Sequence, residues 1–144
     1  MRLVPLLLAM CCATLACSPE VQRSEPEAKA TLDPLYAGPP SLVGEWRVGA
    51  VDDTAVDLGW AITVSVTLDR IGYQSQCVSG TWTYEYARGQ LTTEAVPLAV
   101  CDRGRYPAED GLDAVFGAGG TAMTTPENGV RIEGGGHSVT LFSQ

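Results

Sequence analysis

The stretch that decides the fold is Ile62-Thr63-Val64-Ser65-Val66-Thr67-Leu68, residues 62–68 of the chain. Aliphatic residues occupy every second position and hydroxyl residues lie between them, so one face is apolar and the other is polar. This period of two is typical of a strand with one buried face. The same alternation occurs at Trp82, Tyr84 and Tyr86 and again over residues 137–142. We therefore expect a sheet that buries one side.

Turn signals separate several more strand-like segments between residues 41 and 144. The expected strands are 44–51, 62–68, 82–86, 91–95, 129–133 and 137–142, with 121–125 as a further candidate. Residues 69–72 indicate a turn, and three glycines at 134–136 indicate a hairpin connection. One helix is expected over residues 107–116, with Pro107 in its first turn. The sequence thus predicts an α+β fold, a small β-rich meander or partly closed barrel with one short helix.

The chain is acidic and short. Its 144 residues carry nine Lys plus Arg against seventeen Asp plus Glu, a formal net charge of −8, and the length indicates one domain. Phosphate contacts need a positive face, so nucleic acid is not an expected partner. With one histidine, one lysine and no cluster of ligands, we expect no enzymatic activity, no metal and no cofactor.

Residues 1–16 indicate an export signal. Arg2 precedes an apolar run of about fourteen residues, whereas a membrane span needs about 20. Thr14-Leu15-Ala16-Cys17 resembles the lipobox of bacterial lipoproteins, which implies removal of residues 1–16 and lipidation of Cys17. Two or three acyl chains would then hold the protein on a membrane. Ordinary secretion, with cleavage nearby, is the alternative.

Residues 17–40 comprise the lipidated Cys and an expected disordered tether. The tether is rich in Pro and Glu and has too few large apolar side chains to offset the entropy of ordering. By the lipoprotein resemblance, Ser18 after Cys17 implies the outer membrane. The expected location is therefore the periplasmic side of the outer membrane, with the folded domain over residues 41–144.

The cysteines predict one disulfide bond. Cys11 and Cys12 leave with the signal and Cys17 carries lipid, so Cys77 and Cys101 remain as an even pair in an oxidising compartment. Closing a loop of about 25 residues would contribute about 3.5 kcal/mol. The alternative is two free thiols in a redox or metal site, but the spacing is not Cys-x-x-Cys and no further ligands lie nearby.

Several short motifs occur in a characteristic order. They are Leu42-x-Gly44-x-Trp46, Gln76-Cys77-Val78 followed by Gly80 and Trp82, Pro97-Leu98-Ala99-Val100-Cys101, the helix around 109–116 and the strand at 139–142. Over most of residues 41–144 this order resembles the META domain, the fold of HslJ-type bacterial lipoproteins. The Gly and Asn usual around the first Cys are absent, as are the Thr and Met before the second. The resemblance implies a β-rich envelope protein linked to stress and drug tolerance, with no established chemistry.

The strip formed by Trp82, Tyr84 and Tyr86 is the main candidate binding feature. Aromatic side chains at period two can line a groove for a small apolar ligand, or they can simply form core. Glu85 and Glu94 could pair as carboxylates for glycoside hydrolysis, but we expect them to face solvent.

Other polar candidates have simpler interpretations. The sequence shows no nucleophile or carboxylate within reach of His137, which predicts a polar residue at a strand edge. Asp52, Asp53 and Asp57 lack the spacing of an EF-hand and predict a solvated turn. The segment Asp102-Arg103-Gly104-Arg105 could bind carboxylates or phosphates of a partner, although a solvated loop is the simpler expectation.

We therefore expect an outer-membrane-anchored periplasmic lipoprotein without enzymatic activity, acting as an envelope binding, assembly or stress-tolerance accessory. Its expected partners are the membrane, through acylated Cys17, and an envelope protein or a small apolar ligand. The alternative is an exported inhibitor of a protease or lysozyme, because such inhibitors are also small acidic β-barrels with one disulfide, and an acidic surface suits a basic enzyme. A hydrolase is the least supported class.

Overall fold

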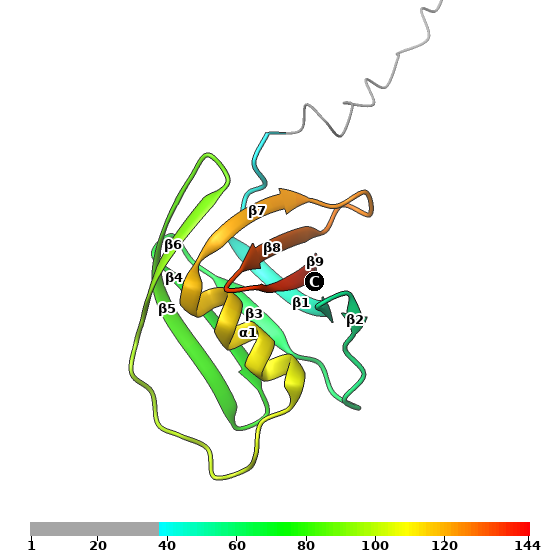
Figure 1. Cartoon of the computed structure of the whole chain (residues 1–144), viewed down its shortest axis with the longest axis vertical. Coiled ribbons are helices and arrows are strands. Elements are labelled where there is room, and N and C mark those ends of the chain that lie inside the picture. Colours follow the sequence, from blue (N-terminus) through cyan, green and yellow to red (C-terminus); the bar gives the residue numbers. More distant parts are fainter. Residues whose placement is uncertain (1–37) are drawn as a thin grey trace, which may run out of the picture. The chain divides into compact units, whose positions relative to one another are not determined.

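Eight antiparallel strands close into a barrel in the computed structural model, which describes residues 38–144 (Figure 1). The barrel strands are β1 (Gly44–Val51), β3 (Thr63–Val66), β4 (Arg70–Ser75), β5 (Val78–Ala87), β6 (Gln90–Ala95), β7 (Gly120–Thr124), β8 (Val130–Gly134) and β9 (His137–Ser143). A ninth, two-residue strand, β2 (Thr54–Ala55), pairs with β1, and the helix is α1 (Pro107–Ala118). The expected β-rich fold with one short helix is confirmed. The expected signal peptide, Cys17 and most of the tether lie outside the described residues.

Strand β1 closes the ring. The strand order is β1-β3-β4-β5-β6-β7-β8-β9, and β9 pairs back with β1 in a register that includes Val48 opposite Leu141. Along its other edge, β1 pairs with two strands. Residues 44–47 pair with β3, and the turn after β1 brings β2 alongside residues 50 and 51. Closure gives partners to backbone groups that an open sheet would leave at its two edges.

Three two-residue turns have the positive φ angles of a type I′ hairpin at both positions. They are Asp52-Asp53 (φ 50° and 59°), Arg88-Gly89 (53° and 81°) and Gly135-Gly136 (61° and 81°). Type I′ turns match the right-handed twist of the strands that they join. The last of these is the expected glycine connection, although Gly134 belongs to β8 and the loop is one residue shorter than predicted.

The turn predicted at residues 69–72 is wrong. Arg70, Ile71 and Gly72 begin strand β4, and the chain turns just before them, where the Thr67 amide donates to the Arg70 carbonyl over 2.9 Å. Asp69 and Gly72 had indicated a turn in this segment. Instead, Ile71 and Tyr73 are buried inside the barrel, so the strand begins within it.

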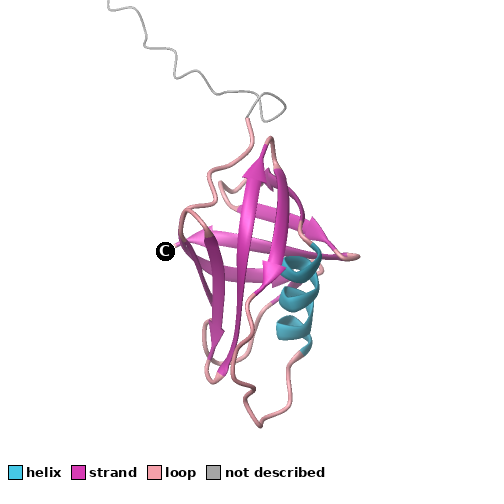
Figure 2. Ribbon diagram, turned by 90° about the vertical axis from the view of Figure 1, so that its left-hand side faces the viewer, coloured by secondary structure: helices cyan, strands magenta, loops and turns pink. Residues whose placement is uncertain are grey.

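The helix packs where two neighbouring strands of the barrel share the fewest paired residues. Strands β6 and β7 pair at only two positions, Gln90 with Thr121 and Leu91 with Gly120. Helix α1 contacts β6 and β8 across this gap and also reaches β9, β1 and β5. Figure 2 shows it along one side of the barrel. The Thr93 hydroxyl donates to the Phe116 carbonyl over 2.5 Å and ties the last turns of the helix to β6.

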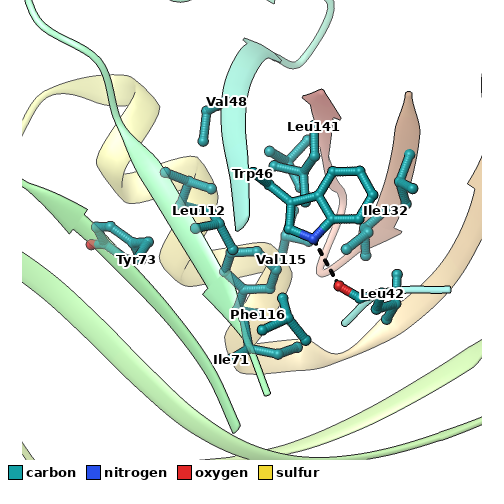
Figure 3. Packing of buried hydrophobic residues seen from close by; sticks show 14 of the residues in the cluster. Leu42, Trp46, Val48, Ile71, Tyr73, Leu112, Val115, Phe116, Ile132 and Leu141 are labelled. Atoms are coloured by element: carbon teal, nitrogen blue, oxygen red, sulfur yellow. Dashed lines mark hydrogen bonds between the residues drawn. The ribbon is translucent and has the colours of Figure 1, made fainter. Parts of the chain in front are cut away.

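The interior is filled by side chains of the chain itself (Figure 3). Helix α1 contributes Leu112, Val115 and Phe116, each fully buried, which explains the short apolar stripe in its sequence. The Trp46 indole donates to the Leu42 carbonyl over 2.7 Å and fixes the entry into β1. The strands supply further fully buried aliphatic residues, namely Ile62, Val64, Ile71 and Val139. Each such side chain contributes about 1.5–3 kcal/mol on burial.

Candidate functional site

The segment between β6 and α1, here called the 96–106 loop, projects past the ends of β4 and β5 (Figures 1 and 2). Two attachments hold it to the barrel. The first is a disulfide between Cys101 in the loop and Cys77 in the β4–β5 turn, as the cysteine count predicts. This bond places the middle of the loop beside the end of the barrel.

The second attachment is the ion pair between half-buried Arg103 and buried Glu109. The two guanidinium Nη atoms lie 2.6 Å and 3.0 Å from the two carboxylate oxygens, a bidentate arrangement. Arg103 also donates to the Ser75 carbonyl over 3.0 Å, and the Tyr106 amide donates to Glu109 over 2.9 Å. Glu109 is fully buried in the first turn of α1, so this contact joins the loop, the helix and the end of β4.

Two aromatic rings surround the Arg103 guanidinium. Its carbon lies 5.1 Å from the ring centre of Tyr106 and 5.9 Å from that of Trp60, within cation–π range. The Trp60 indole donates to the Ser75 hydroxyl over 3.1 Å. The segment is a loop with Asp102, Gly104 and Arg105 exposed, as expected. The Arg103 side chain is half-buried, however, because Trp60, Ser75 and Glu109 converge on it from other parts of the sequence.

Both members of the pair stay charged at neutral pH. Burial by itself raises the pKa of the Glu109 carboxyl, but the hydrogen bonds from Arg103, Ser75 and the Tyr106 amide outweigh it and hold that pKa below its usual value. The hydrogen bond to Glu109 raises the pKa of Arg103.

Arg105 is also engaged within the chain. Its Nη2 lies 2.5 Å from the Asp113 carboxylate and donates to the Tyr73 hydroxyl over 2.6 Å, while its Nε lies 3.4 Å from Asp110. The Tyr73 hydroxyl in turn donates to Asp113 over 2.8 Å, and burial raises the Tyr73 pKa. The sequence suggested that Arg103 and Arg105 could bind carboxylates or phosphates of a partner. In the structure both arginines bind carboxylates of α1.

A cavity of about 350 Å³ lies behind the 96–106 loop. Strand β6 pairs with β5 only as far as Trp82 opposite Ala95, and the chain then leaves the first part of β5. Val78, Trp82, Leu98, Arg105 and Asp113 are among the residues that line the space so created. Its lining mixes apolar side chains with the Arg105–Asp113 ion pair, and its volume is at the small end of ligand pockets.

The three side chains of the aromatic strip on β5 lie in different surroundings. Trp82 is buried in the core, with its ring centre 5.4 Å from that of Phe116, and it also lines the 350 Å³ cavity. The Tyr84 hydroxyl donates to the Thr67 carbonyl over 2.7 Å, and Tyr86 packs partly buried against the core. A small apolar ligand for the strip stays a prediction. Glu85 and Glu94 are exposed, as expected, and line a surface hollow together with Tyr84.

A second polar cluster lies where the β1–β2 turn meets β9. His137 Nδ1 is 2.7 Å from Asp52 Oδ2, and Asp52 Oδ1 accepts the Ser138 amide over 2.8 Å. These hydrogen bonds, that of His137 first, lower the Asp52 pKa. The expectation that no carboxylate lies within reach of His137 is therefore wrong, and only the fold brings the two together.

Arg131 completes this cluster. Its guanidinium lies 2.5 Å from Asp53 and 2.7 Å from Glu133, and it donates to the Ser138 hydroxyl over 2.9 Å. The acidic turn is exposed, as expected, and Asp53 is in addition held by the ion pair with Arg131. A carboxylate-oriented imidazole is an arrangement that suits a general base or a metal ligand. Within residues 38–144, however, no three His, Cys, Asp or Glu side chains gather as a metal site.

No family model, curated protein or solved structure was found to match this chain. Among residues 38–144, no helix has the length and apolar character needed to cross a membrane.

Proposed function

We propose that this chain is an envelope lipoprotein of META-like fold that binds a partner through its outer surface and has no enzymatic activity. The observation that carries the proposal is the Cys77–Cys101 disulfide, because such bonds form and persist in oxidising compartments outside the cytosol. The leader at residues 1–16 provides the export route, and acylated Cys17 provides attachment to the outer membrane.

The packing of the barrel supports recognition at the surface. Fully buried aliphatic and aromatic side chains fill its interior, so the centre of the fold is core. The parts left for a partner are the outer strand faces, the 96–106 loop and the cavity behind it. An envelope protein, or a small apolar ligand at Trp82, is the partner that we propose for these surfaces. In this role the chain is an accessory for envelope assembly or stress tolerance.

Substitution of Cys17 tests the anchoring step. Cys17→Ala should move the protein from the membrane fraction to the soluble periplasmic fraction, because the acyl chains would have no attachment site. Cys11→Ala is the matched control, since Cys11 lies in the expected leader and should leave partition unchanged. Persistence of Cys17→Ala in the membrane fraction would contradict a lipid anchor at this position.

A second candidate function is inhibition of an exported hydrolase, and the shape of the 96–106 loop favours it. The loop projects from the barrel, is tied down at Cys101 and Arg103, and carries Val100 with 91% of its surface exposed. Capture of partners from envelope extract separates the two functions. A hydrolase that is captured stoichiometrically and loses activity supports an inhibitor, whereas outer-membrane assembly components support the accessory role.

A further inference from the structure

We infer that residues 97–101 are a substrate-like binding loop for a serine protease with a small apolar primary pocket, and that Val100 enters this pocket. The inference rests on the second candidate function, inhibition of an exported hydrolase, and it specifies the class of enzyme and the contact residue.

The exposed side chains of the loop have the chemistry that such a cleft binds. Val100 is 91% exposed and Leu98 is 46% exposed, with exposed Ala99 between them. Large apolar side chains gathered on a projecting segment are typical of a binding surface. A protease cleft takes the side chain before the scissile bond into its primary pocket, and a shallow apolar pocket suits a short branched side chain such as valine.

The loop is fixed on both sides of Val100 before any partner binds. On one side the Val96 amide donates to the Thr81 carbonyl over 2.8 Å. On the other side Cys101 is bonded to Cys77, and the Arg103 ion pair follows two residues later. A segment that is held at both ends samples fewer conformations and so loses less conformational entropy on association, which favours binding.

The same attachments explain why such a loop would inhibit and not act as an ordinary substrate. Hydrolysis of the Val100–Cys101 bond adds water and leaves a carboxylate on Val100 and an amine on Cys101. The new carboxylate remains joined to β6, and the new amine remains tied to Cys77 in the β4–β5 turn. Because neither end can diffuse away, the amine stays in place to re-form the bond. The acidic chain would also be attracted to a basic enzyme.

The test compares Val100→Arg with Leu68→Arg in the full chain, purified in detergent. Leu68 is 88% exposed in the β3–β4 turn, so the control adds the same charge at an equally exposed apolar position outside the loop. Peptide-substrate assays with an elastase-type protease and with trypsin give the inhibition constants. The native chain and Leu68→Arg should inhibit the elastase-type enzyme. Val100→Arg should lose about 100-fold in affinity for it and gain inhibition of trypsin.

Val100→Phe gives a second readout, since it should redirect inhibition toward a chymotrypsin-type protease with a deep apolar pocket. The inference is overturned if the native chain does not inhibit the elastase-type enzyme, or if Val100→Arg and Leu68→Arg behave alike. Rapid cleavage at the loop with full protease activity would overturn it as well. If inhibition fails while envelope extract still yields a partner, the loop assignment alone is lost and the surface-binding role remains.

Discussion

His137 Nδ1 and Asp52 Oδ2 lie 2.7 Å apart although 85 residues separate them in the sequence. Asp52 has a φ of 50°, a left-handed conformation that carries a backbone cost for residues other than glycine, although a smaller one for aspartate than for most. Its carboxylate accepts hydrogen bonds from His137 and from the Ser138 amide, and these bonds offset the cost. Asp52 therefore ties the β1–β2 turn to the start of β9.

This contact predicts that stability falls in acid. The hydrogen bonds from His137 and Ser138 lower the Asp52 pKa in the folded state. A carboxyl group of this kind contributes stability above its unfolded pKa of about 3.9 and loses it as the pH falls through the lower, folded value. Urea unfolding from about pH 6 downward should show this loss below about pH 4. Asp52→Asn should reduce this loss, with the remainder due to carboxyls such as Glu109 whose pKa is also lowered, whereas exposed Asp57→Asn should follow the native curve. Identical curves for all three proteins would contradict this role of Asp52.

Removal of the Glu109 charge should destabilise the fold. Glu109→Gln keeps the size of the side chain but leaves half-buried Arg103 without its counter-ion, and it should lower the free energy of unfolding by about 2 kcal/mol, in the range of hydrogen bonds to charged groups. Denaturant unfolding measures the difference against Glu127→Gln, which alters an exposed glutamate in the β7–β8 connection and should change little. Equal unfolding midpoints for the two variants would show that the ion pair does not stabilise the loop.

The disulfide should supply a large part of the stability. Replacement of Cys77 and Cys101 by Ser opens a loop of about 25 residues and should lower the free energy of unfolding by about 3.5 kcal/mol. A reductant should lower the stability of the native chain to a similar extent and have no effect on the double variant. A native chain whose unfolding is indifferent to reductant would argue against a bond in the purified protein.

Gly120 should tolerate no side chain. A Cβ built there would lie 1.8 Å from the Glu133 carbonyl oxygen, and the φ of 152° adds backbone strain. Gly120→Ala should therefore cost about 3 kcal/mol or more by forcing β7 away from β8. Gly104→Ala is the control, since a Cβ at Gly104 meets no atom within 4 Å. Thermal unfolding of both variants checks the difference, and similar melting temperatures would refute the close approach of the two strands.

Features set by local sequence were predictable. The alternation around Trp46 and Val139 indicates strands, and Pro107 with its apolar stripe indicates the helix. The cysteine count indicates the Cys77–Cys101 bond, because the expected removal of the leader and the expected lipidation of Cys17 would leave only this pair. Each of these inferences depends on residues close together or on simple counting, and the described structure contains each of these elements.

Features set by distant contacts were not predictable. Strand β4 was missed because Asp69 and Gly72 favour a turn, whereas burial of Ile71 and Tyr73 inside the barrel favours a strand. The stacking of Arg103 on Trp60 depends on side chains 43 positions apart, and no local spacing signals it. Barrel closure creates these contacts, so a single sequence read along its length does not reveal them.

The most direct test of an exported, acylated surface-binding protein is the intact mass of the chain purified from cell envelopes. We predict loss of residues 1–16, added acyl mass at Cys17, and a mass two hydrogens lower than that of the reduced form, as the Cys77–Cys101 bond requires. A chain that begins at Met1, carries no lipid and has free thiols would contradict the account.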